Sequence, residues 1–155
     1  MIDIRPAKPS DAAGLAELRW EFRAGRGEPA VESHDAFVAR CAAWMQRELG
    51  ADGTWRAWLA EDDGEIVGQV WLHTIQKVPN PIAERERHAY LSNLYVKPSA
   101  RGGIGTRLLE TVLAHTTANG VDSVVLWPSA RSRSMYLRHG FTPNGAVLER
   151  PSTAR

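Results

Sequence analysis

The chain has 155 residues and a mass of 17.1 kDa, which is enough for one domain with one core and too little for two ordinary domains. Apolar residues make up 43% and charged residues 24%, a composition typical of soluble globular proteins. The 19 basic and 18 acidic residues leave a net charge of +1, so charge gives no reason to expect a nucleic-acid or membrane partner. We expect one domain over 1–150 and a frayed tail at 151–155.

Cysteine usage and the N-terminus indicate a cytoplasmic protein. The single cysteine, Cys41, excludes an internal disulfide and fits a reducing compartment. The N-terminus lacks the apolar region of a signal peptide, and no apolar run approaches the roughly 20 residues of a membrane span. The five histidines lie at least 15 residues apart, so we expect no metal site.

The first elements in chain order are a short strand and two helices. Ile2 and Ile4 alternate with charged residues, which predicts a strand. Apolar residues at helical spacing then predict a helix from about residue 10 to 24 and a second helix over 33–50.

A hairpin follows these helices. Residues 55–61 alternate as a strand does, and Asp62-Asp63-Gly64-Glu65 predicts the turn because Gly64 accepts a positive φ. Residues 66–74 form the expected return strand.

The second half of the chain predicts three more strands and two helices. We expect a buried strand at 89–96, a helix at 104–118, a strand at 123–127, a short helix at 131–138 and a last strand at 141–148. A strand–helix–strand unit of this kind predicts a parallel crossover in a mixed sheet. The fold class is therefore α/β (α+β), with helices on both faces of the sheet.

A glycine-rich turn lies between the strand at 89–96 and the helix at 104–118. Glycines there let backbone N–H groups point inward, and the helix N-terminus adds partial positive charge. Together these features predict a cradle for a pyrophosphate. The segment 97–138 also carries six basic and two acidic residues, a local excess of four positive charges. A tight turn without a ligand is the alternative.

Two motifs resemble the GNAT superfamily of acyl-CoA N-acetyltransferases. Residues 94–109, LYVKPSARGGIGTRLL, resemble its pyrophosphate loop, although the loop is one residue shorter than the usual pattern. Residues 136–141, YLRHGF, resemble its later Tyr-x-x-x-Gly-Phe motif. The resemblance implies a mixed central sheet that splays between its fourth and fifth strands, with acetyl-CoA as the acyl donor.

The resemblance also implies which residues bind the cofactor. They come from the strand before the glycine turn, from the turn itself and from the loop before the last helix. They are Leu94, Tyr95, Val96, Arg101, Gly102, Gly103, Ile104, Gly105, Thr106, Ser129, Arg131 and Arg133.

Acetyl transfer needs an oxyanion donor, an acid for the departing thiolate and a neutral amine. By resemblance, the backbone N–H of Tyr95 or Val96 is the donor and Tyr136 is the general acid. The base is less defined, because the strand carries no carboxylate. The candidates elsewhere are His88, Glu86, Glu84 and Glu21. His88 is favoured because an imidazole titrates near neutral pH, and a chain of water molecules is the alternative.

The acceptor pocket is expected between the first two helices and the connection at 75–90. A Trp ring beside a carboxylate suits a cationic amine. The candidate residues are Trp20, Glu21, Tyr90, Ser92, Asn93 and Trp127.

These observations predict an N-acetyltransferase that moves an acetyl group from acetyl-CoA to a primary amine of a small molecule, amino acid or peptide. A homodimer is plausible by resemblance. The shortened loop and the missing strand carboxylate leave open a non-catalytic acyl-CoA-binding sensor or interaction domain.

Overall fold

A computed structural model describes residues 1–152. It contains one five-stranded sheet whose spatial order follows the chain, with antiparallel neighbours from β1 to β4 and a parallel pair at β4 and β5. The strands are β1 (Ile2–Pro6), β2 (Trp55–Asp62), β3 (Glu65–Gln76), β4 (Arg87–Val96) and β5 (Ser123–Val125). The expected mixed sheet is therefore confirmed.

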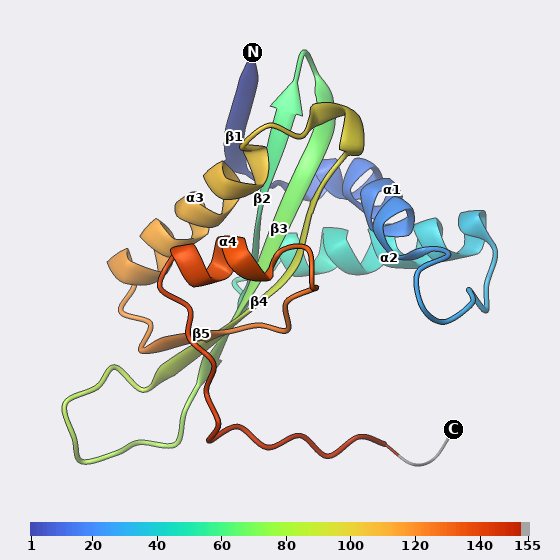
Figure 1. The fold of residues 1–155 in the computed structure, drawn as a ribbon. Coiled ribbons are helices and arrows are strands. Elements are labelled where there is room, and N and C mark those ends of the chain that lie inside the picture. The colour runs from blue at the N-terminus through green and yellow to red at the C-terminus, as the bar shows by residue number, and fades with distance from the viewer. Residues whose placement is uncertain (153–155) are drawn as a thin grey trace.

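Helices cover both faces of this sheet (Figure 1). Two lie on one face and two on the other, and short 3-10 turns precede α1 and α3. The helices are α1 (Ala12–Arg23), α2 (His34–Gly50), α3 (Ile104–Ala118) and α4 (Arg133–Arg138), and the 3-10 turns are η1 (Pro9–Asp11) and η2 (Pro98–Ala100).

One half of the core lies between the sheet and α3. Leu108, Leu109 and Val112 project from α3 at helical spacing and are fully buried. They pack with Leu72 of β3 and Leu91 of β4. Burial of these side chains stabilises the β4–α3–β5 crossover, and so fixes where α3 begins relative to the end of β4.

The other half of the core lies beneath α1 and α2. Leu15 and Ala16 of α1 and Met45 of α2 are buried against Leu59 and Trp71 of the sheet. Most of the α2 surface stays exposed or half-buried. The face that carries α1 and α2 is therefore more loosely filled around α2, and a cavity described below lies there.

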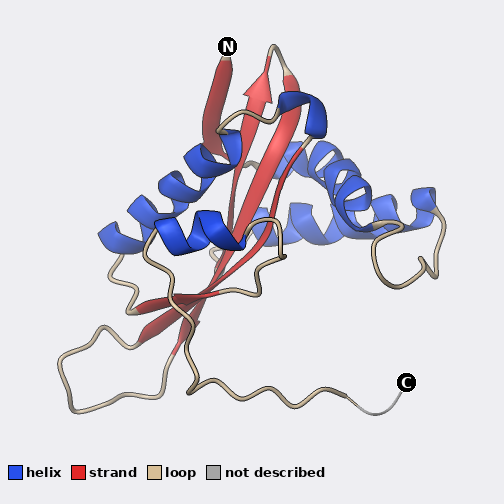
Figure 2. Cartoon of the chain, in the orientation of Figure 1, coloured by secondary structure: helices blue, strands red, loops and turns tan. Residues whose placement is uncertain are grey.

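The C-terminal segment differs from expectation, because residues 141–148 form no strand (Figure 2). Pro143 has no backbone N–H for a ladder. Asn144 then makes a turn, since its Oδ1 accepts from the Ala146 N–H at 2.9 Å. β5 likewise ends at Val125, two residues before the expected end at Trp127.

The described part of the chain, residues 1–152, includes no helix that is both long and apolar enough to span a bilayer. Of the tail expected at 151–155, residues 153–155 lie outside the described residues.

Candidate active site

β4 and β5 separate part of the way along β4. Their parallel pairing begins at His88 and ends at Tyr90. β4 continues to Val96, whereas β5 ends at Val125. Among residues 1–152, no strand pairs with the β5-facing edge of β4 over 91–96. This segment, called here the open edge of β4, is the expected splay between the fourth and fifth strands.

A β-bulge interrupts β4 at the start of the open edge. Tyr95 lies opposite Gln69 of β3, and Ser92 lies opposite Trp71. Three steps along β4 thus match two steps along β3. Asn93 absorbs the extra residue with a φ of +57°, a region that Asn tolerates better than most residues. The bulge turns Ser92 and Asn93 toward the face that carries α1 and α2.

Val96 presents its backbone N–H to the open edge. The Lys97 N–H donates to the Val67 carbonyl oxygen in β3 at 2.8 Å. Because successive N–H groups of a strand point to opposite edges, the Val96 N–H points away from β3 and the Tyr95 N–H points toward it. Of the two expected oxyanion donors, the structure brings only the Val96 N–H to the open edge. The Val96 carbonyl oxygen accepts from Arg101 Nε at 3.3 Å.

The glycine turn leads directly into an uncapped helix. Gly102 and Gly103 have φ values of +145° and +91°, which favour glycine. The first bond of α3 runs from the Arg107 N–H to the Gly103 carbonyl oxygen at 3.0 Å, and no side chain caps this end. The N–H groups of residues 104–106 therefore have no partner within the helix. With the helix dipole they suit an anionic group such as a pyrophosphate.

Tyr136 is the only buried residue of α4. Its ring makes an edge contact with Phe141 at 5.4 Å between centroids. No described residue forms a hydrogen bond with its hydroxyl. The hydroxyl oxygen keeps some exposure to solvent. Burial disfavours the phenolate and raises the pKa of Tyr136 to about 12.

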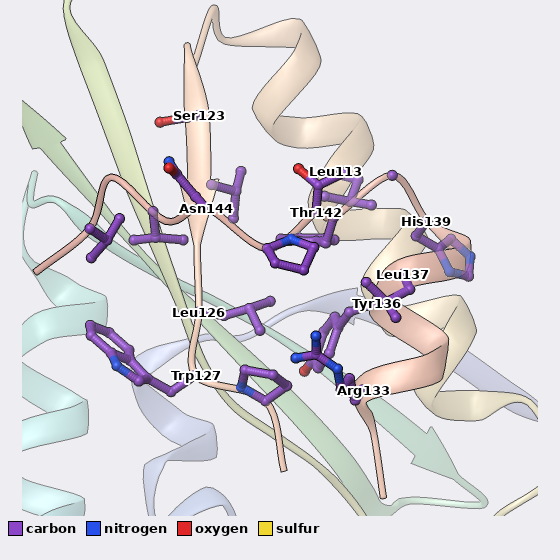
Figure 3. Close-up of a pocket in the computed structure, with 17 residues that line it drawn as sticks. Leu113, Ser123, Leu126, Trp127, Arg133, Tyr136, Leu137, His139, Thr142 and Asn144 are labelled. Carbon is purple, nitrogen blue, oxygen red and sulfur yellow. The ribbon is translucent and has the colours of Figure 1, made fainter. Parts of the chain in front are cut away.

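A cavity of about 580 Å³ lies between α4, β5 and the C-terminal segment. It is called the α4 cavity here. Leu126, in the chain after β5, points toward α4, where Tyr136 and Arg133 lie, and Trp127 points the opposite way (Figure 3). The cavity thus brings together three of the residues predicted from the sequence, Trp127, Arg133 and Tyr136.

Of the other two residues predicted in the loop before α4, Ser129 has a structural role and Arg131 does not contact the cavity. The Ser129 hydroxyl lies 2.8 Å from the Ser132 hydroxyl and accepts from the Ser132 N–H at 3.2 Å. It therefore organises the start of α4. Arg131 is exposed and does not line the α4 cavity.

A second cavity, of about 310 Å³, lies on the opposite face of the sheet, between α1, α2 and strands β2 to β4. It is called the tryptophan cavity here. Most of its wall is aromatic or apolar, and its polar groups come from α1, α2 and the β4 bulge. The lining residues are Arg19, Phe37, Arg40, Cys41, Trp44, Met45, Trp55, Trp71, Ser92 and Asn93.

The structure distributes the predicted acceptor residues over three places. Ser92 and Asn93 line the tryptophan cavity. Tyr90 and Trp127 make an edge contact at 5.3 Å between ring centroids, across the separation of β4 and β5.

Trp20 and Glu21 lie outside the tryptophan cavity. The Trp20 ring packs on the His34 and Phe37 rings at 5.4 and 5.7 Å, and so joins α1 to α2. The Glu21 carboxylate accepts a hydrogen bond from the Tyr95 hydroxyl at 3.0 Å. The Trp20 ring and the Glu21 carboxylate, which were expected to hold one amine together, therefore contact different residues.

His88 lies at the opposite end of β4 from Val96. It stands at the start of β4, where its Nδ1 lies 2.5 Å from the Ser123 hydroxyl. At about 3.3 Å per residue, the strand places it roughly 26 Å from Val96. It lines neither cavity.

Sequence reasoning did not identify Trp55, Trp71 and Phe37 as pocket residues. They come from three separate elements, and only the folded chain brings them together. Asn93 inside the expected buried strand was one available signal, since Asn accepts a positive φ more readily than most residues.

Within residues 1–152, no three His, Cys, Asp or Glu side chains gather in a geometry that could hold a metal ion.

A family model described as "Acetyltransferase (GNAT) family" matches residues 14–141. Among curated proteins, the chain is 38% identical over 149 residues to a mycothiol acetyltransferase of Beutenbergia cavernae. That match covers 90% of this chain but 45% of the relative, so the chain spans less than half the length of that protein. This chain is also 30% identical to an uncharacterized N-acetyltransferase, YhfO, of Bacillus subtilis, and the match covers 90% of this chain and 89% of YhfO.

A similar fold occurs in a predicted acetyltransferase of Clostridium acetobutylicum, solved with acetyl-CoA. Its TM-score is 0.79 at 21% identity, and the match covers 97% of this chain and 96% of that one. The arrangement of the sheet and its helices is thus shared along nearly the whole chain.

Proposed function

Because the chain belongs to the GNAT family of acetyltransferases, which use acetyl-CoA as the acyl donor, we propose that it acetylates a primary amine of a small molecule, amino acid or peptide. The observation that carries this proposal is the placement of Val96. Its free N–H lies on the open edge of β4, one short turn away from the uncapped start of α3.

The residues present fit acetyl-CoA at both ends. The N–H groups of residues 104–106 and the nearby Arg101 would hold the pyrophosphate. The open edge of β4 offers backbone donors and acceptors to a ligand that lies along it. When bound, acetyl-CoA supplies the acetyl group, whose carbonyl carbon bonds to the amine nitrogen as its bond to sulfur breaks.

Val96 would stabilise the charge that develops on the acetyl oxygen. Its backbone N–H is fixed by the Tyr95 and Lys97 contacts to β3 on either side, so it needs no reorganisation during the reaction. One well-placed donor of this kind lowers the barrier by about 3 kcal/mol.

Tyr136 would serve as the acid. With a pKa of about 12, its phenol is protonated throughout the physiological range. Its hydroxyl has no hydrogen-bond partner among the described residues and so is available to a ligand. It would donate a hydrogen bond and then its proton to the departing sulfur, and regain a proton from water.

The residues of the tryptophan cavity suggest how the amine loses its proton. No carboxylate and no imidazole lines this cavity. Burial raises the pKa of the Cys41 thiol, so this group stays protonated. We infer that water takes the amine proton, and His88, at the far end of β4, has no part in the proposal.

The test is the release of CoA thiol from acetyl-CoA in the presence of a panel of primary amines. We expect amine-dependent release, and we expect Tyr136→Phe to lower kcat at least tenfold. The variant removes one hydroxyl that bonds to no described residue, so its melting temperature should match that of the original protein.

Two outcomes would count against the proposal. An unchanged kcat in Tyr136→Phe would show that Tyr136 is not the general acid. Normal acetyl-CoA binding without CoA release for any amine would favour a non-catalytic acyl-CoA-binding domain, the alternative that the shortened loop keeps open.

A further inference from the structure

The tryptophan cavity contains a guanidinium without an acidic partner. Arg19 of α1 is partly buried and lines the cavity. It donates one hydrogen bond, from Nη1 to Asn93 Oδ1 at 3.2 Å. Among residues 1–152, no carboxylate forms an ion pair with it. Its other N–H donors are therefore open to an anionic ligand.

Partial burial of a guanidinium without an anionic partner destabilises the protein when no ligand is bound. Desolvation, helped by the nearby charge of Arg23, lowers the pKa of Arg19. The remaining favourable contact is the Phe22 ring, 5.9 Å from the guanidinium. Such a contact is weaker than a charge-assisted bond to a carboxylate. A ligand carboxylate would therefore gain more at Arg19 than at an exposed arginine.

The rest of the cavity is built to receive an apolar side chain. The Trp44 ring lies 5.3 Å from Trp55 and 5.6 Å from Trp71, and Trp55 lies 6.1 Å from Trp71, so the three indoles form a continuous wall. Phe37 adds to it. A volume of about 310 Å³ suits a small molecule rather than a folded partner.

Charge at the cavity disfavours an acceptor with several amines. The second arginine in the lining, Arg40, is already paired with Glu32. No acidic side chain lines the cavity. Arg23 and Arg26 lie beside the Phe22 ring that Arg19 also contacts, with their guanidinium groups 5.5 and 5.7 Å from it. A polycation would therefore meet two arginines in the lining and no lining carboxylate.

We propose that the tryptophan cavity selects an acceptor of the amino-acid class: a primary amine that carries a carboxylate and an aromatic or bulky apolar side chain. The carboxylate bonds to Arg19, the side chain packs on the indoles of Trp44, Trp55 and Trp71, and the amine lies at the bulge. This inference rests on the proposed function, because it assigns the acceptor of that reaction.

The bulge connects the cavity to the chemistry. Ser92 and Asn93 line the cavity, and they belong to the same strand as Val96, which lies a few residues further along the open edge. An amine held at the bulge is therefore on the strand where the acetyl group is expected to lie. Asn93 also fixes Arg19 through the bond at 3.2 Å, so carboxylate and amine are positioned relative to each other.

The test compares phenylalanine with phenethylamine, which has the same ring and amine but no carboxylate. We expect kcat/KM for phenylalanine to be at least tenfold higher in the original protein. Arg19→Gln should lower kcat/KM for phenylalanine by about 10- to 100-fold, the loss of one or two charge-assisted bonds. The value for phenethylamine should change by less than about twofold, since it makes no bond to Arg19.

Arg23→Gln is the matched control. Arg23 lies on the same helix, contacts the same Phe22 ring and does not line the cavity. This variant should retain the preference for phenylalanine. Melting temperatures of both variants identify any loss of folding.

If turnover is too slow to compare, a binding measurement tests whether Arg19 binds the carboxylate of the acceptor. Phenylalanine should change the tryptophan fluorescence of the protein saturably, and Arg19→Gln should weaken its binding at least tenfold. A preference for phenethylamine, or an equal effect of Arg19→Gln on both amines, would overturn the inference and leave the acetyltransferase proposal intact. Tight phenylalanine binding without CoA release for any amine would overturn the proposed function instead.

Discussion

Gly103 occupies a left-handed backbone conformation, although the neighbouring atoms leave room for a side chain there. It precedes α3 with a φ of +91°, and a Cβ built on it would meet no atom within 4 Å. Replacement by alanine therefore costs only the left-handed backbone conformation, about 1–2 kcal/mol. The expected strain would displace the amides at the start of α3.

We predict that Gly103→Ala weakens acetyl-CoA binding at least tenfold, measured by calorimetry. Gly64 offers a matched control, because it has a φ of +86°, an equally open surrounding and a place in the β2–β3 turn. Gly64→Ala should lose similar stability and keep its affinity for acetyl-CoA. Equal affinities for the two variants would show that the glycine turn is not the phosphate site.

At the scale of elements, an ion-pair network attaches β1 to the start of α1. Both Arg5 Nη atoms donate to the Asp11 carboxylate at 2.9 Å, and Nη2 also donates to Glu61 of β2 at 2.7 Å. The Arg5 guanidinium lowers the pKa of Asp11. The Asp11 carboxylate therefore stabilises the fold above its unfolded pKa of about 3.9. This contribution is lost as the pH falls through the lower folded value.

We predict that Asp11→Asn lowers the free energy of unfolding by about 1 kcal/mol at pH 7. The difference from the original protein should shrink steadily below about pH 4, where the original carboxylate becomes protonated. Asp3→Asn is the control, since Asp3 is exposed on β1 and should change stability little at any pH. Urea denaturation at pH 7, 4 and 3 measures both variants, and a constant difference across this range would contradict the prediction.

Local signals were enough to predict the elements whose bounds depend on residues next to them in the chain. The helix over 104–118 has the predicted bounds, because its apolar stripe, the preceding glycines and the Asn119-Gly120 ending all agree. The hairpin turn was also predicted, and Asp63 and Gly64 take the positive φ values of such a turn, 48° and 86°.

Positions that depend on strand register could not be predicted in this way. Counting back from the hairpin turn places Trp55 opposite Leu72, and hence on the face opposite Trp71. A bulge at Ala60/Glu61 shifts the pairing by one residue, so that Trp55 lies opposite His73 and shares a face with Trp71. The tryptophan cavity exists because of this shift.

The C-terminal segment shows a second limit of local patterns. Residues 141–148 have enough apolar character to resemble a strand, yet the turn at Asn144 and the missing N–H of Pro143 prevent a ladder with β5. Without that strand, the α4 cavity stays open beside Tyr136.

The expected acetyl-CoA site joins the β4–α3–β5 unit to α4 and the segment that follows it. The open edge of β4, the start of α3 and the α4 cavity are built from separate stretches of the chain and exist only once it is folded. A ligand that spans them binds the folded state and not the unfolded one. It must therefore raise the melting temperature as its concentration increases.

We predict a saturable rise with acetyl-CoA. At a hundred times its Kd, the ligand adds about 2.7 kcal/mol to the free energy of unfolding, which corresponds to roughly 5–10 °C for a domain of this size. Gly103→Ala should require at least tenfold more ligand for the same rise, whereas Tyr136→Phe should show the rise of the original protein while losing turnover. This pair separates binding from chemistry, because the role proposed for the glycine turn is to bind the phosphates and the role proposed for Tyr136 is to protonate the sulfur. An original protein that shows no rise at millimolar acetyl-CoA would mean that the shortened glycine turn has lost the donor site.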